Sequence, residues 1–241
     1  MLSKYVLPGS RVELQEVNRD RIGSEEEKKR VYTTQVRDIF SDERIEILMP
    51  IEHNKVVLLP VGAEFDLYFY TPNGLYQCFA SVIDRYKDGT QYAILMERTS
   101  NLRKFQRREY YRLSCALEMS ARPLEEEEIS SLEKNGNLLV PGLPLKSSVV
   151  VDISGGGLRF ISSYAYEPDS LIYCKYKLIQ GGNAKEYTLV AKILTVQEMD
   201  NRPGVYEHRA QYVNMDSGDR EEIIKFIFDE ERMHRKRERG F

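Results

Sequence analysis

The chain has 241 residues, which suits one large or two ordinary domains, and its 35 Lys and Arg are balanced by 38 Asp and Glu for a formal net charge of −3. This balance gives no overall attraction to polyanions, so any anion binding must be local. Three widely spaced cysteines among apolar neighbours favour buried free thiols over disulfides or a metal site. Without a signal-peptide pattern or an apolar run of about 18 residues, we expect a cytoplasmic protein with no membrane insertion.

The first part of the chain consists of short segments rich in β-branched and aromatic residues, separated by turn formers. The predicted strands are 11–17, 30–40, 44–50, 55–60, 65–71, 75–86 and 91–98. Asp88-Gly89, between the last two, predicts a hairpin turn. Closely spaced strands with no long helical pattern predict a small barrel or sandwich over residues 1–98.

A basic segment interrupts this pattern, and we interpret 99–106 as an interdomain linker. Strands resume beyond it, and the predicted ones are 112–123, 146–154, 157–163, 170–180, 186–199 and 205–215. An acidic insert at 124–144 is expected to carry one short helix. The chain ends in a predicted amphipathic helix with Asp216 or Ser217 as its N-cap and with apolar residues at helical spacing: Ile223, Ile224, Ile227 and Phe228. The predicted fold class is mainly β, with two barrels in tandem and a C-terminal helix.

The segment "QRREYYR" contains an RxxxR pair, Arg108 and Arg112, whose spacing points both side chains to one side of the backbone. A solvated linker would explain such a pair, with Glu109 and the acids at 125–128 partly neutralising it. Taken alone, this motif does not identify a ligand site.

The second feature is "DISGGG", in which Asp152 and Ser154 precede three glycines. A hairpin turn would use the Asp and Ser side chains for local hydrogen bonds and glycine for positive φ. Three consecutive glycines exceed what a two-residue turn needs, so they also suggest a place where another group approaches the backbone closely.

One ligand class would satisfy both features. Arginine binds phosphate bidentately, pairs with guanine and stacks on purines, whereas an aspartate accepts hydrogen bonds from guanine N1 and N2. A guanine nucleotide therefore fits the two motifs together. A simple carboxylate ligand would be repelled by Asp152.

The two motifs in this order resemble those of the PilZ domain family, over about residues 103–235. The resemblance implies a six-stranded barrel with a C-terminal helix that binds cyclic di-GMP, with no metal and no catalytic residue. The matching positions, which the resemblance implies bind the ligand, are Arg108, Arg112, Asp152, Ser154 and Gly157. The resemblance further implies that Arg107, directly before the motif, also binds the ligand and favours an intercalated pair of cyclic di-GMP molecules. The PilZ domain is then expected over 107–241.

Residues 1–98 resemble, by length and strand pattern, the barrel that precedes PilZ in flagellar brakes of the YcgR type. This resemblance implies that ligand binding reorients the two barrels, that the partner is the flagellar motor or its stator, and that the protein is recruited to the flagellar basal body to reduce motility. The alternative within the family is an adaptor that controls exopolysaccharide or another cell-envelope output.

Two other function classes fit the sequence less well. The histidines, His53, His208 and His234, are scattered, and no Walker loop, GxSxG or HExxH occurs, so we do not expect an enzyme. The basic tail at 232–241 and the 103–112 cluster offer phosphate contacts, but the overall acidity argues against a nucleic-acid binder.

Overall fold

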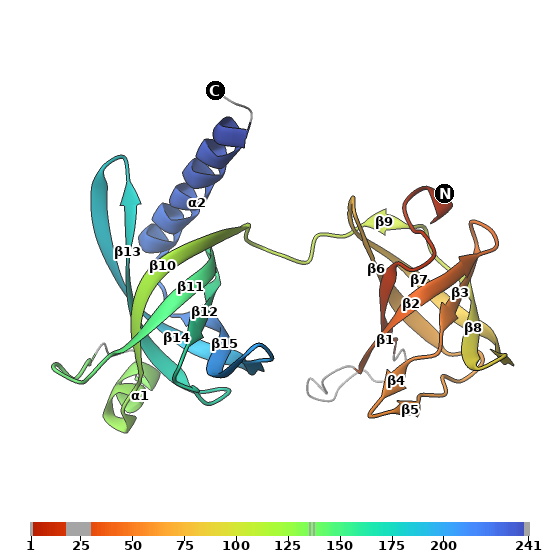
Figure 1. Ribbon diagram of the computed structural model, residues 1–241, viewed down its shortest axis with the longest axis horizontal. Coiled ribbons are helices and arrows are strands. Elements are labelled where there is room, and N and C mark those ends of the chain that lie inside the picture. Colours follow the sequence, from red (N-terminus) through yellow and green to blue (C-terminus); the bar gives the residue numbers. More distant parts are fainter. Residues whose placement is uncertain (1, 18–29, 135, 137, 239–241) are drawn as a thin grey trace. The chain divides into compact units, whose positions relative to one another are not determined.

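The computed structural model describes residues 2–17, 30–134, 136 and 138–238. It divides into two compact units, Met1–Arg107 and Arg108–Phe241, which are described separately (Figure 1). Each unit contains a ring of antiparallel strands, and a long helix follows the second ring. The predicted fold class, two β-barrels in tandem with a C-terminal helix, is confirmed.

The described part of the first unit contains a short 3-10 helix and nine strands. These elements are η1 (Leu2–Lys4), β1 (Arg11–Glu16), β2 (Val31–Ile39), β3 (Arg44–Leu48), β4 (Ile51–Glu52), β5 (Lys55–Val56), β6 (Glu64–Thr71), β7 (Gly74–Asp88), β8 (Gln91–Arg98) and β9 (Arg103–Lys104). Strands β4 and β5 form a separate hairpin, and the others form a sheet of order β6-β1-β2-β3-β8-β7-β9. Because β6 also pairs with β7, the first six strands of that order close into a ring.

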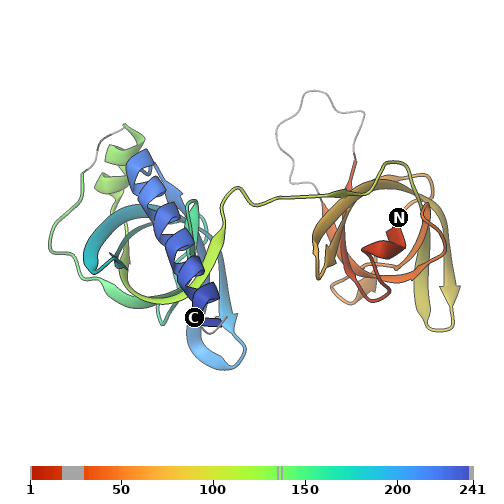
Figure 2. The same cartoon turned by 90° about the horizontal axis from the view of Figure 1, so that it is seen from above.

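Buried and exposed residues alternate along the strands of this ring, and the buried side chains fill its interior. Val12 and Leu14 of β1 and Leu67 and Phe69 of β6 are fully buried, as expected for strands with one face toward a core. The turn η1 lies over one end of the ring, where Leu2 is buried in the same core (Figure 2). The predicted hairpin at Asp88-Gly89 is also present, since β7 and β8 pair up to this turn and Gly89 has φ +58°.

The second unit contains six long strands and two helices. These elements are β10 (Arg112–Pro123), α1 (Glu126–Glu133), β11 (Lys146–Ser154), β12 (Gly157–Ser162), β13 (Leu171–Gln180), β14 (Asn183–Met199), β15 (Arg202–Val213) and α2 (Ser217–Glu238). The strands form a closed barrel of order β10-β11-β12-β15-β14-β13. Helix α2 lies across one end of this barrel, with Ile223, Phe226 and Ile227 buried in the barrel core (Figure 2). Asp216 is the N-cap, because its carboxylate accepts from the N–H of Gly218 at 2.8 Å.

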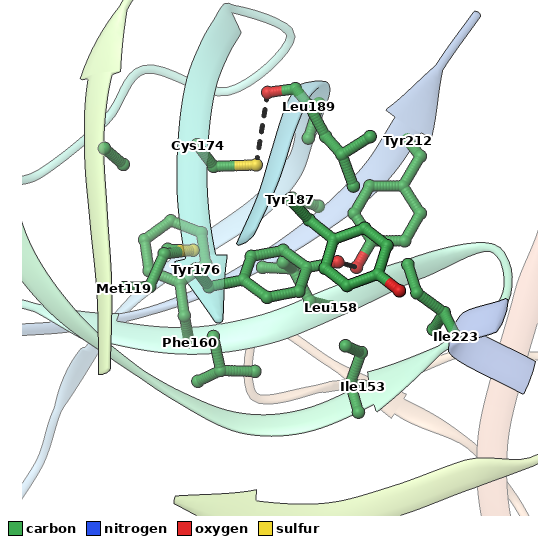
Figure 3. Packing of buried hydrophobic residues seen from close by; sticks show 14 of the residues in the cluster. Met119, Ile153, Leu158, Phe160, Cys174, Tyr176, Tyr187, Leu189, Tyr212 and Ile223 are labelled. Atoms are coloured by element: carbon green, nitrogen blue, oxygen red, sulfur yellow. Dashed lines mark hydrogen bonds between the residues drawn. The ribbon is translucent and has the colours of Figure 1, made fainter. Parts of the chain in front are cut away.

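The core of the second barrel is apolar with a few satisfied polar groups (Figure 3). The hydroxyls of Tyr176 and Tyr212 hydrogen-bond to each other at 2.8 Å, and the Cys174 thiol donates to the Leu189 carbonyl oxygen at 3.3 Å. Burial raises the pKa of Cys174 to about 12. The three cysteines are free; Cys78 and Cys174 are buried as expected, whereas Cys115 is only partly buried.

Two parts of the chain differ from the sequence-based prediction. Of the predicted strand 55–60, only Lys55–Val56 is a strand, and the remainder is irregular with Leu59 buried against the first core. The predicted linker 99–106 includes β9, which pairs with β7, so that the first unit extends to Arg107.

The acidic insert contains the expected short helix, α1, but its acids have a different role from the one predicted. Glu128 of α1 is buried and forms a bidentate ion pair with Arg122 of β10, with N–O distances of 2.7 and 2.6 Å. This pairing with Arg122 lowers the pKa of Glu128 to about 2. The interpretation that the acids at 125–128 neutralise the basic linker is therefore wrong for Glu128, which holds the insert against the barrel.

Candidate ligand-binding site

Strands β10 and β11 bring the two sequence motifs side by side. In the antiparallel register, Arg112 stands opposite Ser154, and Ser114 stands opposite Asp152. Directly opposite residues have Cβ atoms about 4.5–5.5 Å apart, and residues two apart on a strand share a face. The last arginine of RxxxR and the polar residues of DxSxxG therefore lie on one small patch at the end of the barrel.

Ser154 and Gly157 build the turn between β11 and β12. The Ser154 hydroxyl donates to the Gly157 carbonyl oxygen at 3.0 Å and accepts from the Gly156 N–H at 3.4 Å. A Cβ on Gly157 would stand 2.1 Å from the carbonyl oxygen of Ala210 on β15, closer than real Cβ contacts. Both motif positions thus have a structural reason: one shapes the turn and the other lets the barrel close.

The glycines at 155–157 serve close approach, not positive φ. None of these three described residues lies in the left-handed region, so the explanation by positive φ is wrong for this turn. The group that approaches Gly155 and Gly156 is the ring of Tyr110, from the middle of the RxxxR segment. The sequence pattern had predicted an approaching group, and the structure identifies it as part of the chain itself.

Asp152 is held by an ion-pair network that spans three neighbouring strands, β11, β12 and β15. The Arg159 Nε donates to Asp152 Oδ2 at 2.5 Å, and Arg159 Nη1 donates to Glu207 Oε2 at 2.7 Å. The hydrogen bond to Asp152 raises the pKa of the Arg159 guanidinium above its usual value. All three side chains are partly exposed, so this network orients the Asp152 carboxylate at the surface.

Arg159 is a site residue that sequence reasoning missed, although a signal for it existed. With Gly155 and Gly156 as a two-residue turn, counting outward along the hairpin places Arg159 opposite Asp152, as the register shows. Glu207, which completes the network, lies on β15, a strand distant in sequence that pairs with β12. No local pattern indicates that contact.

The three predicted arginines fall in different surroundings. Arg108 and Arg112 are exposed and belong to the second unit. Arg107 belongs to the first unit, where its guanidinium forms an ion pair with Glu13 at 3.2 Å and lies 5.2 Å from the centre of the Tyr70 ring. Within the second unit, the strand register therefore brings Arg112 to the DxSxxG turn.

An aromatic and basic pocket lies beside the RxxxR segment. The rings of Tyr111 and Phe228 of α2 are nearly parallel, with centroids 6.3 Å apart. Burial and a hydrogen bond to Glu231 raise the pKa of Tyr111. The residues that line the pocket are Tyr111, Phe228, Glu231, Arg232, Arg235 and Lys236. Cations of the C-terminal helix thus lie next to the motif.

The buried histidine of the second barrel, His208, has a structural role. His208 is fully buried, its Nε2 accepts from the Tyr166 N–H at 3.2 Å, and burial lowers its pKa, which fits the predicted place on a strand face.

Over the described residues, no cluster of three His, Cys, Asp or Glu side chains is arranged to hold a metal ion. In the same part of the chain, no helix is long and apolar enough to span a membrane.

Solved structures of similar fold were found. The structure of Bacillus subtilis Inhibitor of motility (MotI/DgrA) matches 94% of this chain and 98% of its own length, with TM-score 0.71 and 15% identity. Escherichia coli YcgR in complex with c-di-GMP matches 95% and 87%, with TM-score 0.48 and 11% identity. The K. pneumonia MrkH–c-di-GMP complex matches 95% and 90%, with TM-score 0.41 and 15% identity. The similarity to MotI shows that a solved structure shares the fold of the two barrels.

Comparison with curated protein sequences gave no match. Two family models do match: one described as flagellar protein YcgR (PilZNR) covers residues 8–97, and the PilZ domain model covers residues 101–229. The second match covers more than half of the chain and includes both motifs and the barrel that carries them. The chain belongs to the PilZ domain family and has an N-terminal domain of the YcgR type.

Proposed function

We propose that this protein is a cyclic di-GMP receptor whose ligand site is the patch formed by the RxxxR and DxSxxG motifs. The observation that carries this proposal is the β10–β11 register. It sets Arg112 opposite Ser154, which shares a strand face with Asp152, two residues earlier on β11. Guanidinium groups suit the phosphates and the purine faces, and a carboxylate suits the guanine donors. Solved YcgR and MrkH complexes contain c-di-GMP, which supports the same ligand class here.

Each motif residue then has a distinct role. Arg108 and Arg112 contact phosphate and guanine. Asp152 accepts from guanine N1 and N2, because the Arg159 hydrogen bond uses only part of the acceptor capacity of its carboxylate. Ser154 and Gly157 keep the turn in the shape that presents Asp152. This assignment needs no bond chemistry, so the protein acts as a receptor and not as an enzyme.

The proposed output is a change in the arrangement of the two units. Phosphates that draw Arg107 toward Arg108 and Arg112 would fix the connection between the two units, and a charged ligand that orders a linker is an established kind of switch. The ligand must favour one arrangement over the other to have any effect. We propose the flagellar motor or its stator as the partner, with reduced motility as the result. The YcgR-type N-terminal domain supports this choice.

Calorimetric titration of the purified full chain with cyclic di-GMP tests the receptor assignment. We expect saturable binding that Asp152→Ala weakens while the circular dichroism remains native. Arg202→Ala, which removes an exposed arginine on β15, is the matched control and should bind as the wild type. Turnover of cyclic di-GMP would instead indicate an enzyme, and strongly salt-dependent binding to DNA or RNA without a cyclic di-GMP response would indicate a nucleic-acid binder.

The same titration measures the stoichiometry. Arg107 precedes the RxxxR pair, and we propose that the ligand is an intercalated pair, giving two molecules of cyclic di-GMP per chain at saturation. One molecule per chain would contradict this part of the proposal and leave the receptor assignment intact.

A swimming assay tests the output. Expression of the wild type in a flagellated host with raised cyclic di-GMP should reduce swimming, whereas Arg112→Ala should not. Unchanged swimming together with altered exopolysaccharide would favour the alternative, an adaptor for the cell envelope.

A further inference from the structure

Tyr110, the central residue of the RxxxR segment, lies directly on the glycines of the DxSxxG turn. A Cβ on Gly155 would stand 2.7 Å from Cδ1 of the Tyr110 ring, and a Cβ on Gly156 would stand 3.0 Å from its Cδ2. The first distance is shorter than real Cβ contacts and the second is tighter than most. The ring therefore occupies the space that side chains at these two positions would fill.

The opposite end of Tyr110 is anchored to helix α2. Arg220 Nη1 donates to the Tyr110 hydroxyl at 2.9 Å, and the Arg220 guanidinium carbon lies 5.5 Å from the ring centroid. Ile224, one helical turn further, closes the seat, since its Cγ1 would be 2.8 Å from a Cβ on Gly155. Tyr110 thus joins three parts of the second unit: the RxxxR segment, the turn and the helix.

This contact restricts the two motif arginines. Arg108 and Arg112 are each two residues from Tyr110, so fixing its backbone and ring leaves the arginines few arrangements relative to the turn. A ligand that binds arginines already placed beside Asp152 loses less conformational entropy than one that must order the segment itself.

We infer that Tyr110 is a positioning residue, which holds the RxxxR segment on the DxSxxG turn so that the arginines face a preformed site. The inference rests on the proposed function for its effect on affinity. It also assigns a reason to Gly155 and Gly156, which occupy two of the three unspecified positions of DxSxxG: they form the seat of Tyr110 and not a surface for the ligand.

The first experiment measures the holding contact without any ligand. Trypsin cleavage after Arg107 and Arg108 in the full chain, followed by mass spectrometry, reports how often this segment leaves the barrel. We expect Tyr110→Ala to accelerate cleavage there by about tenfold and Tyr110→Phe by less, because the phenyl ring keeps its seat and only the Arg220 bond is lost. Tyr92→Ala, at an exposed tyrosine of the first unit, is the control. Equal cleavage in wild type and Tyr110→Ala would overturn the inference.

The second experiment is a double-mutant cycle on cyclic di-GMP affinity with Tyr110→Ala and Gly156→Ala. Gly156→Ala changes no motif residue and adds one methyl group to the seat. It should weaken binding in the wild-type background and have little further effect in the Tyr110→Ala background, because the seat is then empty. A purely structural effect of the methyl group would instead be the same in both backgrounds, and that additivity would overturn the inference.

The two experiments separate the inference from the proposed function. If the wild type does not bind cyclic di-GMP, the receptor proposal fails, while the cleavage rates still decide whether Tyr110 holds the segment. If the wild type binds and Tyr110→Ala binds equally well with a native circular dichroism spectrum, the positioning role is wrong and the receptor proposal stands.

Discussion

The two barrels share an architecture and differ in where their charged and polar groups converge. Both are rings of antiparallel strands with an apolar core and a helical element over one end, a single turn in the first unit and the 22-residue α2 in the second. At the end of the second barrel, Asp152, Arg159 and Glu207 form a partly exposed network beside Arg112. In the first unit, Glu13 pairs with Arg11 and Arg107. The shared ring supplies a scaffold, and the placement of a few charges decides which barrel can carry the proposed ligand site.

The largest expected effect concerns the buried Arg122–Glu128 pair of the second unit. Arg122→Ala leaves the Glu128 carboxylate buried without its partner, so the free energy of unfolding of the second unit should fall by about 3–5 kcal/mol. Replacing both residues by apolar ones, Arg122→Met with Glu128→Leu, should cost much less. Urea denaturation measures both. Equal losses in the single and double variants would contradict this explanation.

The same pair predicts a pH dependence. The Arg122 partnership lowers the pKa of Glu128 from 4.5 to about 2, so its contribution to stability is complete above pH 4.5 and is lost as the pH falls toward 2. The wild type should therefore lose part of its free energy of unfolding over this range. The double apolar variant should show a smaller loss, measured by urea denaturation at a series of pH values.

The next largest effect is expected at the apolar residues that the helical elements bury in each barrel core. Leu2 of η1 and Ile227 of α2 are both about 1% exposed, so truncation to alanine should cost roughly 2–5 kcal/mol in each case. Calorimetry should show that Leu2→Ala lowers the melting temperature of the first unit. Ile227→Ala should lower the melting temperature of the second. Met233→Ala, at a 41% exposed position of α2, is the control and should change stability by about 0.5 kcal/mol or less. A shift of both transitions by either core variant would show that the barrels do not unfold independently.

A third test addresses the charges of the second barrel. Arg108→Ala or Arg112→Ala should each reduce cyclic di-GMP affinity by roughly 2 kcal/mol, because a charge-assisted contact to the ligand is lost. Calorimetric titration measures this change, with Arg202→Ala as the control. Native circular dichroism with unchanged affinity would place the ligand site elsewhere.

The smallest effect concerns the charges of the first unit. If Arg107 serves the ligand, Glu13 competes for it, and Glu13→Gln should tighten cyclic di-GMP binding. The pair is partly exposed, with the Arg107 side chain 47% accessible, so the gain should be about 0.2–1 kcal/mol and should shrink as salt is added. Glu16→Gln, at an exposed acid of the same strand, is the control. Weaker binding by Glu13→Gln would show that Glu13 assists the ligand instead of competing.

Much of the fold followed from the sequence because strands with one buried face leave a regular pattern. The long strands were predicted within a few residues. The failures were local: 55–60 is apolar, but only its first two residues pair, and β9, at Arg103–Lys104, is a polar dipeptide held by backbone pairing with β7. The pairing of such short segments depends on which strand edge lies nearby in the folded chain, and the residue types of the segment give little information on this.

The candidate site was less predictable than the fold. The motif positions could be read from the sequence, but Arg159 needed the hairpin register and Glu207 needed the long-range pairing of β12 with β15. The three glycines predicted a close approach without revealing that Tyr110 makes it. Contacts between residues far apart in the chain are set by three-dimensional packing, which a single sequence does not display.

The boundary between the two units falls between Arg107 and Arg108, two adjacent arginines. The first is held by Glu13 and Tyr70 of one barrel, and the second begins the other. The two arginines lie in a segment of irregular backbone, residues 105–111, that connects β9 to β10. A ligand that contacts both side chains would have to release Arg107 from Glu13 and Tyr70 or change the backbone of this segment. Under the proposed function, ligand binding would then be thermodynamically coupled to the backbone between the barrels, so that fixing this segment by other means would change the affinity for the ligand.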